Sequence, residues 1–253
     1  PGDPAPQTAG HQTKTHKNDT YFSRCPGNAI EGKRVLLAPH IHGRSNVEQE
    51  YQLHDGVTTA LELEWGIEHL GKWYESRKGK ALINYGASVN WPFERFKAIG
   101  NYQNAIDSLL QMTLKGEANI EAMTNTILRA AAETITPDAL NKTLVNIKAS
   151  LADGGIGIGA PIGYLPKTNP NEMFQVYKLA GELQVLVFSH VRQPDIISIQ
   201  EAIAVAVLTG APLHIVHINS MSLGNIGLSL EMVNAANKKD FDISTELYPY
   251  TAG

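Results

Sequence analysis

Cysteine is nearly missing from this sequence, and its scarcity excludes an internal disulfide framework. Cys25 is the one thiol among 253 residues, so the fold must be held together by packing rather than by covalent cross-links. The thiol lies close to a polar N-terminal stretch, and we interpret it as incidental rather than as a nucleophile.

Long apolar runs and clusters of basic residues are also lacking. No uninterrupted apolar segment approaches the roughly 20 residues that a transmembrane helix needs, so we expect no membrane association. The formal net charge is −4, and no block of Lys and Arg provides the positive surface that nucleic-acid binding requires. We therefore expect neither nucleic acid nor a membrane as a partner, and the oligomeric state stays open.

The N-terminal stretch differs in composition from the rest of the chain. Residues 1–20 are polar and rich in Pro, Gly and Thr, without the apolar segment of a signal peptide. We therefore predict a disordered or remnant N-terminal segment over residues 1–29 and a cytoplasmic protein. Residues 30–253 are long enough for one large domain with a sizeable core.

Short apolar β-type runs alternate with helical patterns along the remaining chain. Strand candidates fall within residues 33–39, 51–66, 79–89, 154–163, 183–191, 211–219 and 241–250. Helical patterns lie at 67–79, within 103–152, and at 169–183, 195–210 and 229–239. This alternation predicts an α/β fold with a parallel sheet. About seven strands favour an incomplete (β/α)8 TIM-type barrel, and an open doubly wound sheet is the alternative.

Polar residues gather where these strands end, which is where a parallel barrel places its chemistry. The first candidate ends in His40-Ile-His42. Because a strand has a period of two, both imidazoles point to the same face. Two neutral imidazoles on one face can chelate one cation, so this pair predicts a metal site.

Other strand ends carry further candidate ligands. The second candidate ends in Glu62-Leu-Glu64, where two neighbouring carboxylates would repel each other unless a cation lay beside them. His190 follows a later strand. His214 and His217 lie three residues apart and would face opposite sides of an extended strand, so we favour His217 as the ligand and interpret His214 as packed or outward-facing.

Each of these signals is weak when taken alone. A buried histidine usually serves packing, and the glutamate pair could be a solvated strand face. The prediction of a metal site depends on the shared position of these residues at strand ends. The Gly-rich stretch over residues 154–163 matches neither the Walker A nor the dinucleotide-binding pattern, and we interpret it as close backbone packing.

The order of several motifs resembles the amidohydrolase superfamily. They are the HxH pair, "DGVTT", "HVR", "HIVHINS" and "YPYTAG". Within the superfamily the chain is most similar to the N-acyl-D-amino-acid deacylases, also called D-aminoacylases, and "GVTTALELE" with "ALINYGAS" resembles the acyl-D-glutamate branch. The resemblance covers about residues 30–253.

This resemblance implies a zinc-type hydrolase with one or two divalent ions in a (β/α)8 barrel. It implies hydrolysis of the N-acyl amide bond to a carboxylate and a D-amino acid. The implied metal ligands are His40, His42, Glu64, His190 and His217, with Glu64 in place of the family's cysteine and Glu62 as the reserve. Tyr164 matches the tyrosine that polarises the scissile carbonyl in the family.

Arg192 is the candidate for the substrate's carboxylate, because a guanidinium binds two carboxylate oxygens at once. A role in an internal ion pair is an equal alternative at this point.

The sequence also departs from the family pattern. The usual "PGFIDxHxH" is shortened before His40, the small β-sandwich domain that normally precedes the barrel is missing, and the sequence stops at "YPYTAG". The family's catalytic aspartate follows the eighth strand, so we expect a truncated fragment without its general base and with little activity of its own.

Two other functions remain open from the sequence. One is a cyclic amidase of the dihydroorotase or hydantoinase kind, although no lysine stands at a strand end to supply the bridging group usual there. The other is a non-catalytic barrel fragment that acts as a binding module.

Overall fold

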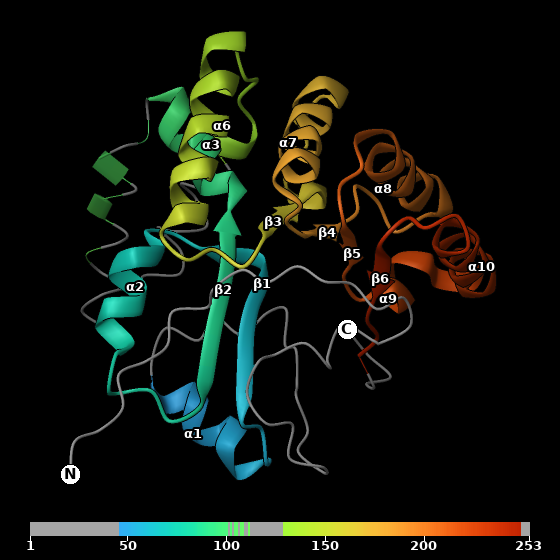
Figure 1. Cartoon of the computed structure of the whole chain (residues 1–253). Coiled ribbons are helices and arrows are strands. Elements are labelled where there is room, and N and C mark those ends of the chain that lie inside the picture. The colour runs from blue at the N-terminus through green and yellow to red at the C-terminus, as the bar shows by residue number, and fades with distance from the viewer. Residues whose placement is uncertain are drawn as a thin grey trace. The chain divides into compact units, whose positions relative to one another are not determined.

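Six parallel strands form one sheet in the computed structural model, which describes residues 46–100 and 129–248 with a few isolated positions between them (Figure 1). All of these residues belong to the unit Lys33–Gly253. The strands are β1 (Thr59–Ile67), β2 (Asn84–Asn90), β3 (Ile158–Pro161), β4 (Val187–His190), β5 (Leu213–Ile215) and β6 (Ile243–Thr245). They correspond to six of the seven predicted strand regions. The strand at 33–39, His40, His42 and the boundary after residue 29 lie outside the described residues.

The order of the strands decides between the two predicted architectures. They follow one another as β1-β2-β3-β4-β5-β6, and every neighbouring pair is parallel. A doubly wound sheet reverses its strand order at a switch point, and no reversal occurs among the described strands. The barrel-type α/β fold is therefore confirmed, and the doubly wound alternative is wrong for this part of the chain.

Helices connect the strands. They are α1 (Asn46–His54), α2 (Leu70–Arg77), α3 (Trp91–Ile99), α6 (Pro137–Ala152), α7 (Pro170–Leu183), α8 (Ile196–Thr209), α9 (Ile218–Ser222) and α10 (Ile226–Asn237), with 3-10 turns η2 (Ile162–Tyr164) and η3 (Leu223–Asn225). None of the described helices is long and apolar enough to cross a bilayer. α1 occupies the start of a region that we predicted as strand, and α3 was not predicted.

Side-chain caps explain where several helices begin. Thr136 Oγ1 accepts a hydrogen bond from the Ala139 backbone N–H at 3.2 Å, and Asn169 Oδ1 accepts one from Glu172 N–H at 2.9 Å. Both residues are followed by proline at the first helical position, which needs no hydrogen-bond donor there. Asn90 caps the unpredicted α3 in a similar way, because its Oδ1 accepts from Phe93 N–H and Pro92 lies in the first turn.

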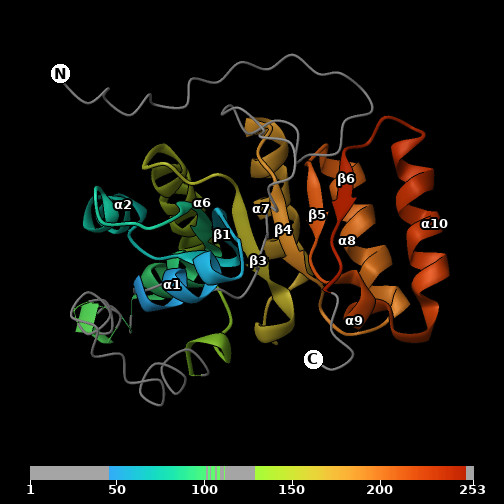
Figure 2. The same cartoon turned by 90° about the horizontal axis from the view of Figure 1, so that it is seen from below.

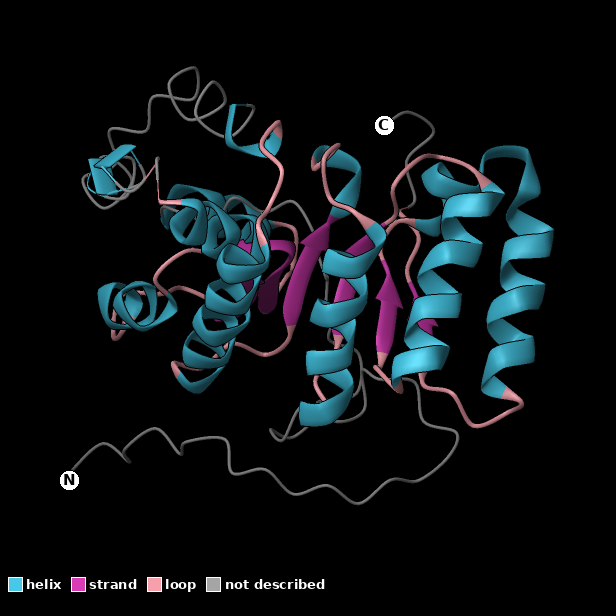
Figure 3. Ribbon diagram, turned by 90° about the horizontal axis from the view of Figure 1, so that it is seen from above, coloured by secondary structure: helices cyan, strands magenta, loops and turns pink. Residues whose placement is uncertain are grey.

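The two faces of the sheet bury different side chains. Val187 of β4 and Leu213 of β5 pack with helix residues in the large core between the strands and the helices. Figures 2 and 3 show α7, α8 and α10 along this side of the strands. Phe188 alternates to the opposite face, where it packs with Leu63 and Val216 in a separate cluster. Alternation of this kind gives the interior of a barrel and its outer layer.

A fully buried ion pair fixes the helical side of the fold. Arg95 Nε on α3 donates to Glu172 Oε1 on α7 at 2.7 Å, and both side chains are 0% exposed. The same guanidinium donates to the backbone oxygens of Ala130 and Glu133. Burial raises the pKa of Glu172, against the lowering effect of Arg95. One guanidinium therefore joins three segments that are distant in sequence.

Removing this guanidinium should destabilise the fold strongly. In an Arg95→Met variant the Glu172 carboxylate stays buried without its cation, and loss of one partner of a buried pair costs about 3–5 kcal/mol. Urea denaturation should show this loss in the free energy of unfolding. The exposed Lys142→Ala on α6 serves as the control and should change it by less than about 0.5 kcal/mol. Equal unfolding free energies for the two variants would contradict this account.

Candidate metal centre

Three predicted ligands meet near the carboxyl ends of β1, β4 and β5. Glu64 comes from β1, His190 is the last residue of β4, and His217 follows β5. His190 Nδ1 lies 2.9 Å from Glu64 Oε1, and His217 Nε2 lies 3.2 Å from Glu64 Oε2. The two nitrogens are 3.1 Å apart. Among the described residues these three side chains have the geometry of a metal-binding group, with one donor atom from each lying within 4.8 Å of the others.

With Glu64 ionised, protons alone cannot satisfy all three contacts of this group. If both nitrogens carry a proton toward Glu64, two N–H groups face each other across 3.1 Å. If His217 Nε2 instead accepts from His190, its lone pair faces a carboxylate oxygen at 3.2 Å. A divalent cation turns all three lone-pair donors toward itself and removes the conflict. A carboxylate with two imidazoles is also a donor set that zinc accepts, so the residues present fit a metal ion.

His217 reaches the group because the strand has already ended. It adopts a left-handed backbone conformation, with φ 35° and ψ 52°, immediately before α9. The alternation argument that placed His214 and His217 on opposite faces therefore does not apply, since β5 stops at Ile215. His214 is packed, as predicted. Its ring lies against Phe188, and its Nδ1 is 2.9 Å from Ser244 Oγ.

An irregularity in β1 separates the two glutamates of the second predicted strand. Between Glu62 and Ile67 the chain advances five positions, while the partner strand advances two, from Ala87 to Val89. Glu62 is buried and lines a small cavity that Gln49 and Arg77 also line. Glu64 instead meets the two histidines. The structure thus places Glu64, the preferred candidate ligand, in the group and leaves Glu62, the alternative candidate, outside it.

Tyr164 in η2 stands beside the group. Its ring centroid lies 4.7 Å from that of His190 and 5.3 Å from that of Trp65. Partial burial and the nearby negative charge of Glu64 raise the pKa of Tyr164, so the phenol keeps its proton at neutral pH. The hydroxyl is therefore a hydrogen-bond donor next to the three ligands.

Two glycines of the Gly-rich stretch allow this close assembly. A Cβ at Gly159 would lie 2.7 Å from the backbone oxygen of Glu64, and one at Gly163 would lie 2.7 Å from Cδ2 of the His190 ring. Real Cβ atoms do not come so close to other heavy atoms. The interpretation of this stretch as close packing is thus supported, and the packing is against the metal group itself.

Arg192 takes the alternative role that the sequence left open. Its Nε and Nη2 both lie 3.0 Å from the carboxylate of Glu201, and its Nη1 donates to the Thr168 backbone oxygen at 2.9 Å. The guanidinium is thus engaged within the protein. Its predicted contact with a substrate carboxylate stays a prediction.

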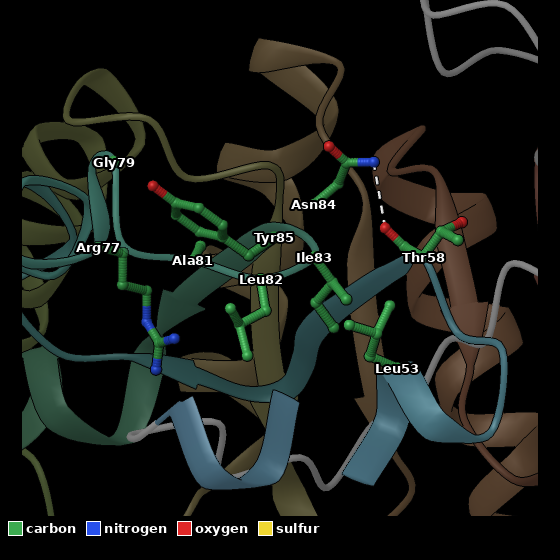
Figure 4. Close-up of a pocket in the computed structure, with 9 residues that line it drawn as sticks. All are labelled: Leu53, Thr58, Arg77, Gly79, Ala81, Leu82, Ile83, Asn84 and Tyr85. Carbon is green, nitrogen blue, oxygen red and sulfur yellow. Dashed lines mark hydrogen bonds between the residues drawn. The ribbon is translucent and has the colours of Figure 1, made fainter. Parts of the chain in front are cut away.

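One cavity of the described residues lies away from these ligands. It has a volume of about 520 Å³ and is lined by residues near the start of β1 and β2, among them Leu53, Thr58, Arg77 and Tyr85 (Figure 4). The chemistry of a parallel barrel belongs to the opposite ends of the strands. We therefore place the functional site at the Glu64 group rather than in this cavity.

The sequence reasoning missed one contact of the group. Ser220 Oγ lies 3.0 Å from His217 Nδ1 and 3.0 Å from the His217 backbone oxygen. The available signal was the spacing His217-Ile-Asn-Ser220 directly after a strand, where a helical first turn brings the fourth residue back to the first.

Comparison with solved structures agrees with the fold. The chain is similar to an N-acyl-D-glutamate deacylase from Bordetella bronchiseptica complexed with zinc and a phosphonate inhibitor, with a TM-score of 0.61, 15% identity and coverage of 79% of this chain and 43% of that one. It is also similar to a D-aminoacylase described as defining a novel subset of amidohydrolases, with a TM-score of 0.57, 16% identity and coverage of 82% and 46%. The sheet and its helices match part of an amidohydrolase barrel. The chain spans less than half the length of either structure.

Comparison with protein-family models and with curated protein sequences finds no match. The likeness to solved structures is therefore one of fold. Evidence for a function comes instead from the family resemblance of the sequence motifs and from the geometry of Glu64, His190 and His217.

Replacing each of the two glutamates by glutamine in turn should show which one binds the metal. Glu64→Gln keeps the shape of the side chain but removes its charge. We expect its affinity for Zn²⁺ to fall by more than about 100-fold, which exceeds the usual effect of residues outside the ligand set. The matched control Glu62→Gln should keep an affinity close to that of the unaltered protein. Isothermal titration with a competing chelator measures both, and a larger loss in Glu62→Gln would show that the wrong carboxylate was chosen.

A methyl group at position 163 should disturb the His190 ring. Overpacking of a tight contact costs about 1–3 kcal/mol, so we expect Gly163→Ala to weaken Zn²⁺ binding by about tenfold or more. Gly227→Ala is the matched control, because a Cβ there meets open space. The same chelator competition compares the two, and unchanged binding in Gly163→Ala would refute the close contact.

Proposed function

We propose that the protein containing this chain is a metal-dependent hydrolase that cleaves the amide bond of N-acyl-D-amino acids. The observation that carries this proposal is the convergence of Glu64, His190 and His217 at the carboxyl ends of three parallel strands. The likeness of fold to N-acyl-D-glutamate deacylase and D-aminoacylase structures supports it. Because the chain spans less than half of those structures, the activity is proposed for the protein as a whole.

Glu64, His190 and His217 are proposed to hold one divalent ion, with zinc as the favoured metal and His40 and His42 as further proposed ligands. Such an ion polarises a carbonyl oxygen and lowers the pKa of water to about 7. The chain's own contribution is a buried setting for these ligands, since the Glu64 side chain is 0% exposed and that of His190 only 13%. Burial strengthens the interaction of the carboxylate with a cation.

Tyr164 is proposed to orient the substrate. Its side chain is about half exposed, so a ligand at the mouth of the sheet can reach it, and its hydroxyl can donate a hydrogen bond to the oxygen of the scissile carbonyl. That bond strengthens as negative charge develops on the oxygen. In the overall reaction a water oxygen attaches to the acyl carbon, the C–N bond breaks, and the leaving amine takes a proton. No described residue is assigned as the general base.

N-acyl-D-glutamate is the substrate to test first, given the branch that the sequence resembles. Its side-chain carboxylate would need a cationic partner. If Arg192 plays that part, it must exchange the Glu201 carboxylate for that of the substrate, because its donors already face Glu201. This requirement makes Arg192 a weaker proposal than the three metal ligands.

An assay of the zinc-loaded full-length protein should show release of D-glutamate from N-acetyl-D-glutamate but not of L-glutamate from its mirror image. Tyr164→Phe should lower kcat by about 10²–10³-fold, the usual cost of losing one hydrogen-bond donor to a developing oxyanion. Metal analysis accompanies the assay. A protein that binds zinc yet hydrolyses no acyl-D-amino acid of a broad panel would refute the substrate class, and one that binds no metal would favour a binding module.

A further inference from the structure

We propose that Ser220 is a positioning residue that holds the His217 imidazole in the one neutral form able to bind a cation through Nε2. This inference rests on the metal site of the proposed function but not on the substrate. It concerns the last residue of the motif "HIVHINS", to which the sequence analysis gave no role.

The geometry gives Ser220 two simultaneous contacts. Its Oγ lies 3.0 Å from Nδ1 of the His217 ring and 3.0 Å from the backbone oxygen of the same residue. The opposite ring nitrogen, Nε2, faces Glu64 and His190. Ser220 therefore contacts the side of the imidazole that points away from the metal group.

The donor and acceptor roles follow from what each atom can do. A backbone carbonyl oxygen can only accept, so the Ser220 hydroxyl satisfies both contacts by donating its proton there. Its lone pair then accepts a hydrogen bond from Nδ1–H. A neutral imidazole carries one proton, so Nε2 is left with its lone pair directed at Glu64 and His190. This is the protonation that a metal-binding histidine needs.

The segment that carries Ser220 is itself fixed. The backbone N–H of Ile218 donates to the Glu246 backbone oxygen at 3.0 Å, and the Asn219 side chain donates to that of Tyr248 at 3.3 Å. These bonds tie the first turn of α9 to the chain that follows β6. The two residues directly after the left-handed His217 are thus held in place, and Ser220 adds the contact that sets the rotation of the ring.

The test compares Ser220→Ala with two matched variants. Ser220→Thr keeps a hydroxyl and should keep the effect. Ser222→Ala removes another hydroxyl of α9, one that donates to Ser229 Oγ at 2.8 Å rather than to His217, and so reports on loosening of the helix alone. We expect Ser220→Ala to weaken Zn²⁺ binding by about 10–100-fold, while the other two stay close to the unaltered protein.

A spectroscopic readout separates positioning from simple structural support. In ¹⁵N-labelled, zinc-loaded protein, His217 should show a proton on Nδ1 and none on Nε2. In Ser220→Ala the Nδ1 proton should exchange with water far faster.

Three results would overturn the proposal. They are a zinc-bound His217 that lacks a proton on Nδ1, unchanged zinc affinity in Ser220→Ala, and an equal loss in Ser222→Ala. Failure to hydrolyse acyl-D-amino acids with these zinc affinities intact would count against the substrate class and leave the role of Ser220 standing.

Discussion

One buried carboxylate organises the end of the sheet. The Glu64 side chain has no exposed surface, and it touches imidazoles from two other strand ends. Burial of a charged group costs free energy unless partners compensate for it, so the Glu64 carboxylate needs polar partners at this position. The two histidines approach within hydrogen-bond distance of the carboxylate, and Ser220 lies on the far side of one of them.

Departures from regular strand geometry make this arrangement possible. A regular strand would leave Leu63 and Glu64 on opposite faces, yet Leu63 packs with Phe188 in the interior while Glu64 meets His190. The irregular pairing of β1 after Glu62 reconciles the two. After β5, the left-handed conformation of His217 likewise turns its side chain toward Glu64. Such irregularities are common beside functional sites because they re-aim a side chain.

Features with a periodic pattern or a short sequence signature could be predicted from the sequence, whereas side-chain contacts between separate segments could not. Strand–helix alternation and Pro-containing caps such as Thr136 and Asn169 have direct signatures, so the barrel-type fold and several helix starts were predictable. The choice of Glu64 over Glu62 came from a family resemblance, because alternation puts both on one face. Ser220 and the engagement of Arg192 by Glu201 depend on side-chain contacts between separate turns, which no periodicity encodes. Helix α1 was missed because its apolar face is weak, and α3 because its cap, Asn90, ends a strand.

The long sequence separation within the Glu64 group affects how the protein reaches its folded state. Glu64 and His217 are 153 positions apart, and in the sheet two strands, β2 and β3, intervene between β1 and β4. Closing so long a loop costs chain entropy that must be repaid by contacts formed beforehand. We therefore expect the intervening strand–helix units to stack before the carboxylate meets its imidazoles. The centre should then form late in folding, on a scaffold that is already assembled.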